Sequence, residues 1–154
     1  MKLLLSLALT AALFSAPAFA QAPGSTGLGV VIGSPNGLTG RHWINEESSI
    51  EGSLGWALSG SRFQVNVNYL FNKMNLIPIG DESLDLFFGG GLSLRTKSGK
   101  QDGEVVFGPR VPVGVSYTFA NPNLEVFAQV ALNIGIIPSS DIYADGNLGA
   151  RFYF

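Results

Sequence analysis

Two neighbouring stretches of the chain, residues 50–59 and 63–72, alternate almost strictly between apolar and polar side chains. A repeat of two residues indicates a β-strand with one apolar and one polar face. Both stretches match the length of roughly 9–11 residues that a tilted strand needs to cross a bilayer. In the second stretch the apolar row is Phe63, Val65, Val67, Tyr69 and Phe71, and the opposite row is Gln64, Asn66, Asn68, Leu70 and Asn72.

The same alternation, punctuated by turn residues, continues along the chain. It predicts strands over residues 27–32, 38–44, 50–59, 63–72, 84–96, 110–119 and 124–134, and a last strand that ends at Phe154. Pro-Asn-Gly at 35–37, Gly-Ser at 60–61 and Asn-Pro-Asn at 121–123 have the chemistry of tight turns. We therefore predict an all-β fold over residues 27–154: an eight-stranded antiparallel up-and-down transmembrane β-barrel with both termini at one end.

Three segments interrupt this alternation of apolar and polar residues. Residues 73–83 include an apolar run from Leu76 to Ile79 and are predicted to form a long connection. Pro112 stands in the middle of a strand, where a closed barrel needs every backbone donor, so we expect a bulge or an unpaired site there. Residues 97–103 are rich in Lys, Gly, Gln and Asp and are predicted to form an exposed loop.

The N-terminus is typical of a cleavable secretory signal peptide over residues 1–20. Lys2 supplies the positive charge, residues 3–14 form a short apolar run, and Ala18 and Ala20 form a small-residue cleavage site before Gln21. The run is shorter than the ~18 residues of a spanning helix. The mature chain is thus expected to begin at Gln21, with residues 21–26 as a short leader; a signal anchor is the alternative.

Composition narrows the class of protein. Charged residues are 13% of the chain, against about 25% in an ordinary soluble domain. Cysteine is absent, which excludes disulfides and thiolate metal sites. Without Lys2, eleven acidic residues exceed eight basic ones, a balance that argues against nucleic acid as a partner. One histidine and scattered carboxylates form no metal-ligand cluster, and no cofactor is expected.

The few charges of the predicted strands fall on the polar rows, in comparable numbers of both signs. If these rows face the barrel lumen, the charges must pair, because an unpaired buried charge costs several kcal/mol. We therefore predict a lumen charge network of Arg–carboxylate contacts; the alternative is scattered surface charges on a soluble sandwich. The network would contain Glu51, Asp85, Arg95, Arg110, Glu125, Asp145 and Arg151.

Aromatic residues gather near the predicted strand ends, as in the interfacial girdles of membrane barrels. The predicted girdle contains Trp43, Trp56, Tyr69, Phe71, Tyr117, Phe119, Phe152 and Phe154. Each of them taken singly is equally consistent with an ordinary core aromatic.

The last eight residues resemble the C-terminal assembly signal of bacterial outer-membrane barrels, with Asn147, Gly149, Phe152 and Phe154 at the matching positions. Residues 27–154 as a whole resemble the small OmpA/OmpX-type barrels. Residues 89–91, 110–114 and 149–154 are similar to a group of uncharacterised small outer-membrane proteins. The resemblance implies the cell outer membrane as location, with outer-membrane lipid and the barrel assembly machinery as partners. We expect a monomer.

Three functional hypotheses remain from the sequence. The first is a membrane barrel with a structural, envelope-integrity or weak interaction role, its lumen largely plugged by polar side chains. The second is a soluble periplasmic β-barrel that binds a small apolar ligand. The third, an enzyme, is disfavoured, because His42 is the only histidine and no serine lies two residues after it.

Overall fold

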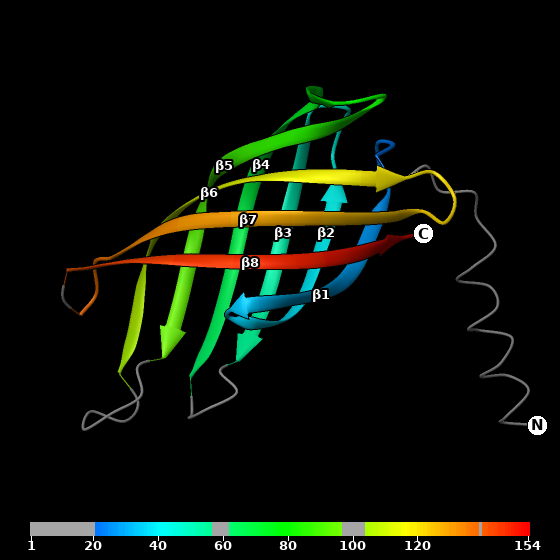
Figure 1. The fold of residues 1–154 in the computed structure, drawn as a ribbon. Helices are drawn as coiled ribbons and strands as arrows, with labels where there is room; N and C mark the ends of the chain where they lie inside the picture. Colours follow the sequence, from blue (N-terminus) through cyan, green and yellow to red (C-terminus); the bar gives the residue numbers. More distant parts are fainter. Residues whose placement is uncertain (1–20, 57–61, 97–103, 139) are drawn as a thin grey trace, which may run out of the picture.

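The structure is a computed structural model that describes residues 21–56, 62–96, 104–138 and 140–154. These residues form one closed barrel of eight antiparallel strands, in which each strand pairs with its neighbours in sequence and β8 pairs with β1 (Figure 1). The predicted fold class is confirmed. The strands are β1 Thr26–Ser34, β2 Asn36–Trp43, β3 Ser48–Trp56, β4 Phe63–Ile79, β5 Glu82–Thr96, β6 Val105–Phe119, β7 Leu124–Gly135 and β8 Asp141–Tyr153.

Closure joins the beginning of the described chain to its end. Gly27 of β1 lies opposite Tyr153 of β8, and Ser34 lies opposite Gly146. Both ends of the strand sequence therefore meet at one end of the barrel, which we call the terminal end. The β1–β2 turn at Pro35 lies at the other end, which we call the distal end. The predicted signal peptide, the Gly-Ser turn at 60–61 and the loop 97–103 lie outside the described residues.

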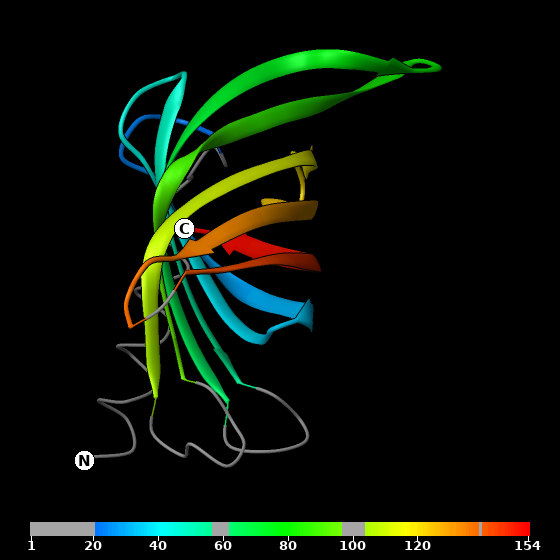
Figure 2. The ribbon, with the colours of Figure 1, turned by 90° about the vertical axis from the view of Figure 1, so that its left-hand side faces the viewer.

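The long connection predicted over residues 73–83 is wrong. β4 continues to Ile79, and only Gly80 and Asp81 separate it from β5. The pairing register shifts between Lys73 and Ile77, where Asn75 has a φ of 53°. Such a bulge adds residues to one strand and breaks the period of two, so the sequence pattern hides the continuation. Figure 2 shows this β4–β5 hairpin extending beyond the rest of the barrel.

Pro112 is accommodated by an unpaired site rather than by a change of register. Phe88 lies opposite Val113 and Gly91 lies opposite Arg110, which is one continuous register with the pairs between them missing. On its other side Pro112 keeps its place opposite Ala131 of β7. One neighbour thus tolerates the missing N–H donor, as expected for a proline inside a sheet.

Polar side chains occupy the inside of the barrel and apolar side chains occupy the outside. Gln64, Ser116 and Gln129 are buried, whereas Val113 of β6 and Val130 of β7 are exposed to 41% and 59%. The inside is not uniformly polar, because Val31, Leu70, Phe87 and Phe127 form a buried apolar cluster within it. No helix within the described ranges is long and apolar enough to span a membrane.

Candidate functional site

Side chains from strands that are not neighbours meet inside the barrel. The Gln64 amide on β4 donates to Asp145 on β8 over 2.8 Å. Arg151 on β8 forms an ion pair with Glu51 on β3. Because these strands do not pair with one another, such contacts exist only across the lumen. The polar rows therefore point inward.

Four charged side chains form a compact cluster towards the terminal end. Arg41 Nη1 lies 2.8 Å from Glu125 Oε1 and Arg41 Nη2 lies 3.5 Å from Glu51 Oε2. Arg151 pairs with Glu51 and, through Nη1, lies 3.1 Å from Glu125 Oε2. All four side chains are at most 2% exposed. Two cations against two anions make the cluster neutral, the arrangement that keeps buried charges tolerable.

Aromatic rings enclose this four-charge cluster. The Tyr153 hydroxyl donates to Glu125 over 2.7 Å, and the Trp43 indole N–H donates to the Tyr153 oxygen over 3.4 Å. The Arg41 guanidinium lies 4.5 Å from the centre of the Phe87 ring, and that of Arg151 lies 3.8 Å from the centre of the Phe127 ring. Flat guanidinium faces stack well on such rings while their edges donate hydrogen bonds.

A second layer lies towards the distal end. Arg110 Nη1 lies 2.5 Å from Asp145 Oδ2, and the amides of Asn133 and Gln64 donate to the same oxygen over 2.9 and 2.8 Å. Amide side chains also reach the four-charge cluster from other strands. Gln129 and Asn68 donate to Glu51 over 3.0 and 3.1 Å.

The two remaining residues of the predicted network lie at opposite ends of the lumen. Asp85, near the terminal end, accepts hydrogen bonds from the Gln21 side chain (2.5 Å) and from the Asn75 backbone N–H (2.7 Å). Arg95, at the distal end, lies 3.5 Å from Asp141 and stacks 3.5 Å from the centre of the Tyr143 ring. Within the part of the chain that the structure describes, Asp85 therefore has hydrogen-bond donors in place of the expected arginine partner.

Sequence reasoning missed one member of the network and misplaced one aromatic residue. Arg41 was absent from the predicted set, although it lies directly opposite Glu51 in the β2–β3 pairing. The prediction that Trp43 belongs to the outer girdle is wrong, because Trp43 is 1% exposed and lies inside the barrel beside Tyr153. Arg41 and Trp43 share one face of β2. Apolar and polar residues alternate poorly along this strand, so its sequence does not show which face points into the lumen.

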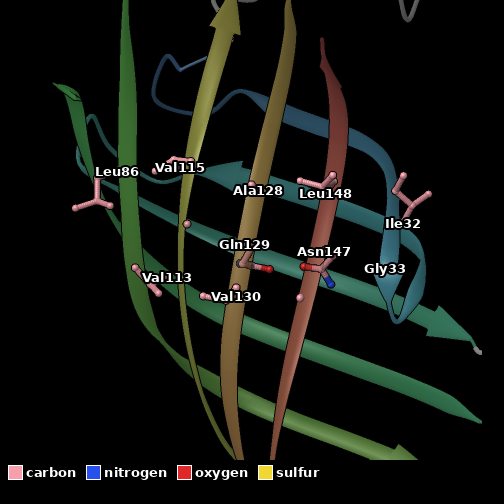
Figure 3. A pocket seen from close by; sticks show the side chains of 12 residues that line it. Ile32, Gly33, Leu86, Val113, Val115, Ala128, Gln129, Val130, Asn147 and Leu148 are labelled. Atoms are coloured by element: carbon pink, nitrogen blue, oxygen red, sulfur yellow. The ribbon is translucent and has the colours of Figure 1, made fainter. Parts of the chain in front are cut away.

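The outer face is apolar on every strand. Its large exposed side chains include Leu28, Ile32, Leu38, Ile50, Leu54, Val67, Phe71, Phe88, Leu92, Val111, Val113, Val130, Leu132, Ile142 and Leu148. A shallow hollow on this face is lined by side chains of β5, β6, β7, β8 and β1, among them Leu86, Val115 and Leu148 (Figure 3). Trp56, Tyr69, Phe71, Phe119, Phe152 and Phe154 of the predicted girdle are exposed, and Tyr117 is half-buried.

The residues of the predicted assembly signal have distinct places in β8 and after it. The Asn147 amide donates to the Ser34 carbonyl oxygen at 3.5 Å. Gly149 lies against the Phe127 ring, whose Cζ would be 2.4 Å from an added Cβ. Phe152 and Phe154 are exposed, whereas Tyr153 between them is buried. The glycine thus makes room for a ring in the lumen, independently of any role in assembly.

Comparison with solved structures identifies this architecture. The N-terminal β-barrel domain of Pseudomonas aeruginosa OprF aligns with a TM-score of 0.67 and 13% sequence identity, over 87% of this chain and all of that domain. The chain has the fold of the small outer-membrane β-barrels. Neisserial surface protein A aligns with a TM-score of 0.54 and 17% identity, over 84% of this chain and 94% of that one. No protein-family model and no curated protein sequence matches the chain.

Proposed function

We propose that the chain is an integral outer-membrane barrel that is exported by residues 1–20, cleaved before Gln21 and held in lipid by its apolar exterior. The observation that carries this proposal is the inverted distribution of polarity. Charged and amide side chains fill the inside, while large apolar side chains cover the outside of all eight strands. A soluble barrel would have to expose that belt to water, where contiguous apolar patches of more than a few hundred Å² are rare.

The contents of the lumen favour a structural or envelope role over bulk transport. The four-charge cluster, its aromatic neighbours and the Arg110–Asp145 layer meet across the barrel at two levels. Passage of a solute would require buried ion pairs to separate, at a cost of several kcal/mol for each charge left without a partner. An eight-stranded barrel leaves little space beyond its own side chains.

The same lumen argues against a soluble barrel that holds a small apolar ligand. Such ligands bind in cavities with largely apolar walls, whereas arginine, carboxylate and amide groups converge in this lumen. The apolar hollow of Figure 3 lies on the outer face instead, where lipid chains would cover it. The proposed function is also non-enzymatic. His42 is exposed on the outer face and its ring hydrogen-bonds with the Thr26 hydroxyl, 2.9 Å away.

Fractionation of the cells that make the protein tests the proposed location. We expect the chain in the outer-membrane fraction, soluble only in detergent, and running faster on gels before heating than after it. Recovery in the periplasm without detergent would reject the membrane barrel and favour the ligand-binding alternative.

A variant of the last residue tests the proposed partnership with the barrel assembly machinery. Phe154 is 37% exposed and lies outside the lumen network. Phe154→Ala should therefore leave the stability of the barrel refolded in detergent nearly unchanged, but lower the amount assembled in cells several-fold. Tyr153→Phe is the matched control, because it alters the lumen and keeps both outward rings. Equal amounts of assembled wild type and Phe154→Ala in cells would refute the proposal that Phe154 belongs to an assembly signal.

A further inference from the structure

A polar pocket of about 250 Å³ opens at the distal end of the lumen. Its walls come from the end of the β1–β2 hairpin, from the ends of β3 and β5, from the start of β4 and from β8. They include Arg62, Gln64, Arg95 and Asp145, with Trp56 and Phe63, which are exposed on the outer face, at the rim. In the proposed orientation, with the termini on the periplasmic side, this pocket faces the outside of the cell.

The floor of the pocket is closed and electrically neutral. Asp145 pairs with Arg110 at 2.5 Å and accepts further hydrogen bonds from the amides of Gln64 and Asn133. Its negative charge is thus compensated inside the lumen and does not face a ligand alone. A molecule that enters from the distal end would stop at this layer.

The walls, in contrast, carry an excess of positive charge. Arg62 is exposed and forms no ion pair with a described carboxylate. Arg95 has a partly exposed carboxylate, Asp141, at 3.5 Å, and its side chain is 19% exposed. Arg95 Nε is buried and donates to no acceptor among the described residues. Stacking on Tyr143 holds this guanidinium with one donor unsatisfied.

We propose that the pocket binds a small water-soluble oxyanion, a phosphate or carboxylate carried on a group about the size of a monosaccharide. Guanidinium groups recognise such anions through paired N–H donors. The volume is several times the ~30 Å³ that one water molecule occupies in the liquid. Of the lining side chains, Gln64 and Arg95 lie on the inward rows, and the outward-facing Trp56 and Phe63 lie at the rim. The polar inward side chains favour a ligand that arrives from water.

Calorimetric titration of the detergent-solubilised mature chain with glucose 6-phosphate tests the proposal. We expect saturable binding of glucose 6-phosphate and none of glucose at the same concentrations. Arg95→Gln should weaken binding at least tenfold, and Arg62→Gln at least threefold. Lys73→Gln is the matched control: it removes the same charge from an exposed position beyond the other end of the lumen, and should change the affinity less than twofold.

Arg95→Lys separates recognition from simple attraction, because it keeps the charge and removes the planar fork. It should weaken binding severalfold while leaving heat-modifiable gel mobility intact. Equal binding of glucose and glucose 6-phosphate would overturn the proposal, and so would equal effects of Lys73→Gln and Arg95→Gln on the affinity. Binding of a phosphorylated lipid added to the micelles, without binding of glucose 6-phosphate, would also overturn it. The outcome is separate from that of fractionation, since a soluble barrel could still bind the anion and a membrane barrel could fail to do so.

Discussion

The buried four-charge cluster makes a quantitative prediction for Glu125→Gln. Glu125 accepts hydrogen bonds from Arg41 at 2.8 Å, Arg151 at 3.1 Å and Tyr153 at 2.7 Å. The substitution keeps the shape of the side chain but leaves two buried arginines with one carboxylate, Glu51. Removing one partner of a buried ion pair typically costs about 3–5 kcal/mol. We expect the free energy of unfolding to fall by that amount, a change of two or more powers of ten in the unfolding equilibrium constant.

Urea unfolding in detergent micelles, followed by the fluorescence of Trp43 and Trp56, measures this loss. The matched control is Glu47→Gln, whose carboxylate is 75% exposed and 4.0 Å from Lys73; exposed pairs are worth less than about 1 kcal/mol. Arg41→Gln combined with Glu125→Gln restores the charge balance, so the double variant should lose less stability than the sum of the two single variants. A loss below 1 kcal/mol for Glu125→Gln, or strict additivity in the double variant, would refute the reasoning.

Two further pairs of variants test the outer face and the strand packing. Val130→Arg, in the middle of β7, should lower the free energy of unfolding in a bilayer by about 2–4 kcal/mol. Ile142→Arg, near the distal rim, should lower it by at most about 1 kcal/mol. Equal losses in lipid vesicles would contradict an apolar environment that depends on depth. Gly91→Ala should destabilise the barrel by about 1–3 kcal/mol, because its Cβ would lie 2.1 Å from the Val67 carbonyl oxygen. Gly90→Ala, whose Cβ meets nothing closer than 4.0 Å, should be nearly neutral in the same urea titration, and the reverse order would show that the strands pack differently.

The fold was predictable because most strands keep their period of two without interruption. β7 and the first part of β4 present an apolar and a polar row that can be sorted by sequence alone, and their rows lie on the faces expected. The faces of the last strand were equally predictable, because the exposed Phe152 and Phe154 alternate with the buried Tyr153. Pairing of consecutive strands then leaves one simple closed topology.

The errors have local physical causes. The bulge near Asn75 shifts the register, so the second half of β4 no longer matches the pattern of the first half. Arg41 and Trp43 were difficult because an indole suits either a headgroup layer or a packed lumen, and the choice depends on the partner Tyr153, more than a hundred residues away in sequence. The distal pocket brings together residues of six strands and the β1–β2 turn, and no single stretch of sequence shows that these residues lie close together.

The most direct test of the central claim, that the apolar face meets lipid and the polar face fills the lumen, uses the two tryptophans. Trp56 is 43% exposed on the outer face, whereas Trp43 is 1% exposed inside. Trp43→Phe and Trp56→Phe leave one tryptophan each, and each variant is reconstituted in vesicles of lipids brominated along their acyl chains. Strong quenching of Trp56 together with little quenching of Trp43 is the predicted result. Quenching of Trp43 as strong as that of Trp56, or quenching of neither, would contradict the account.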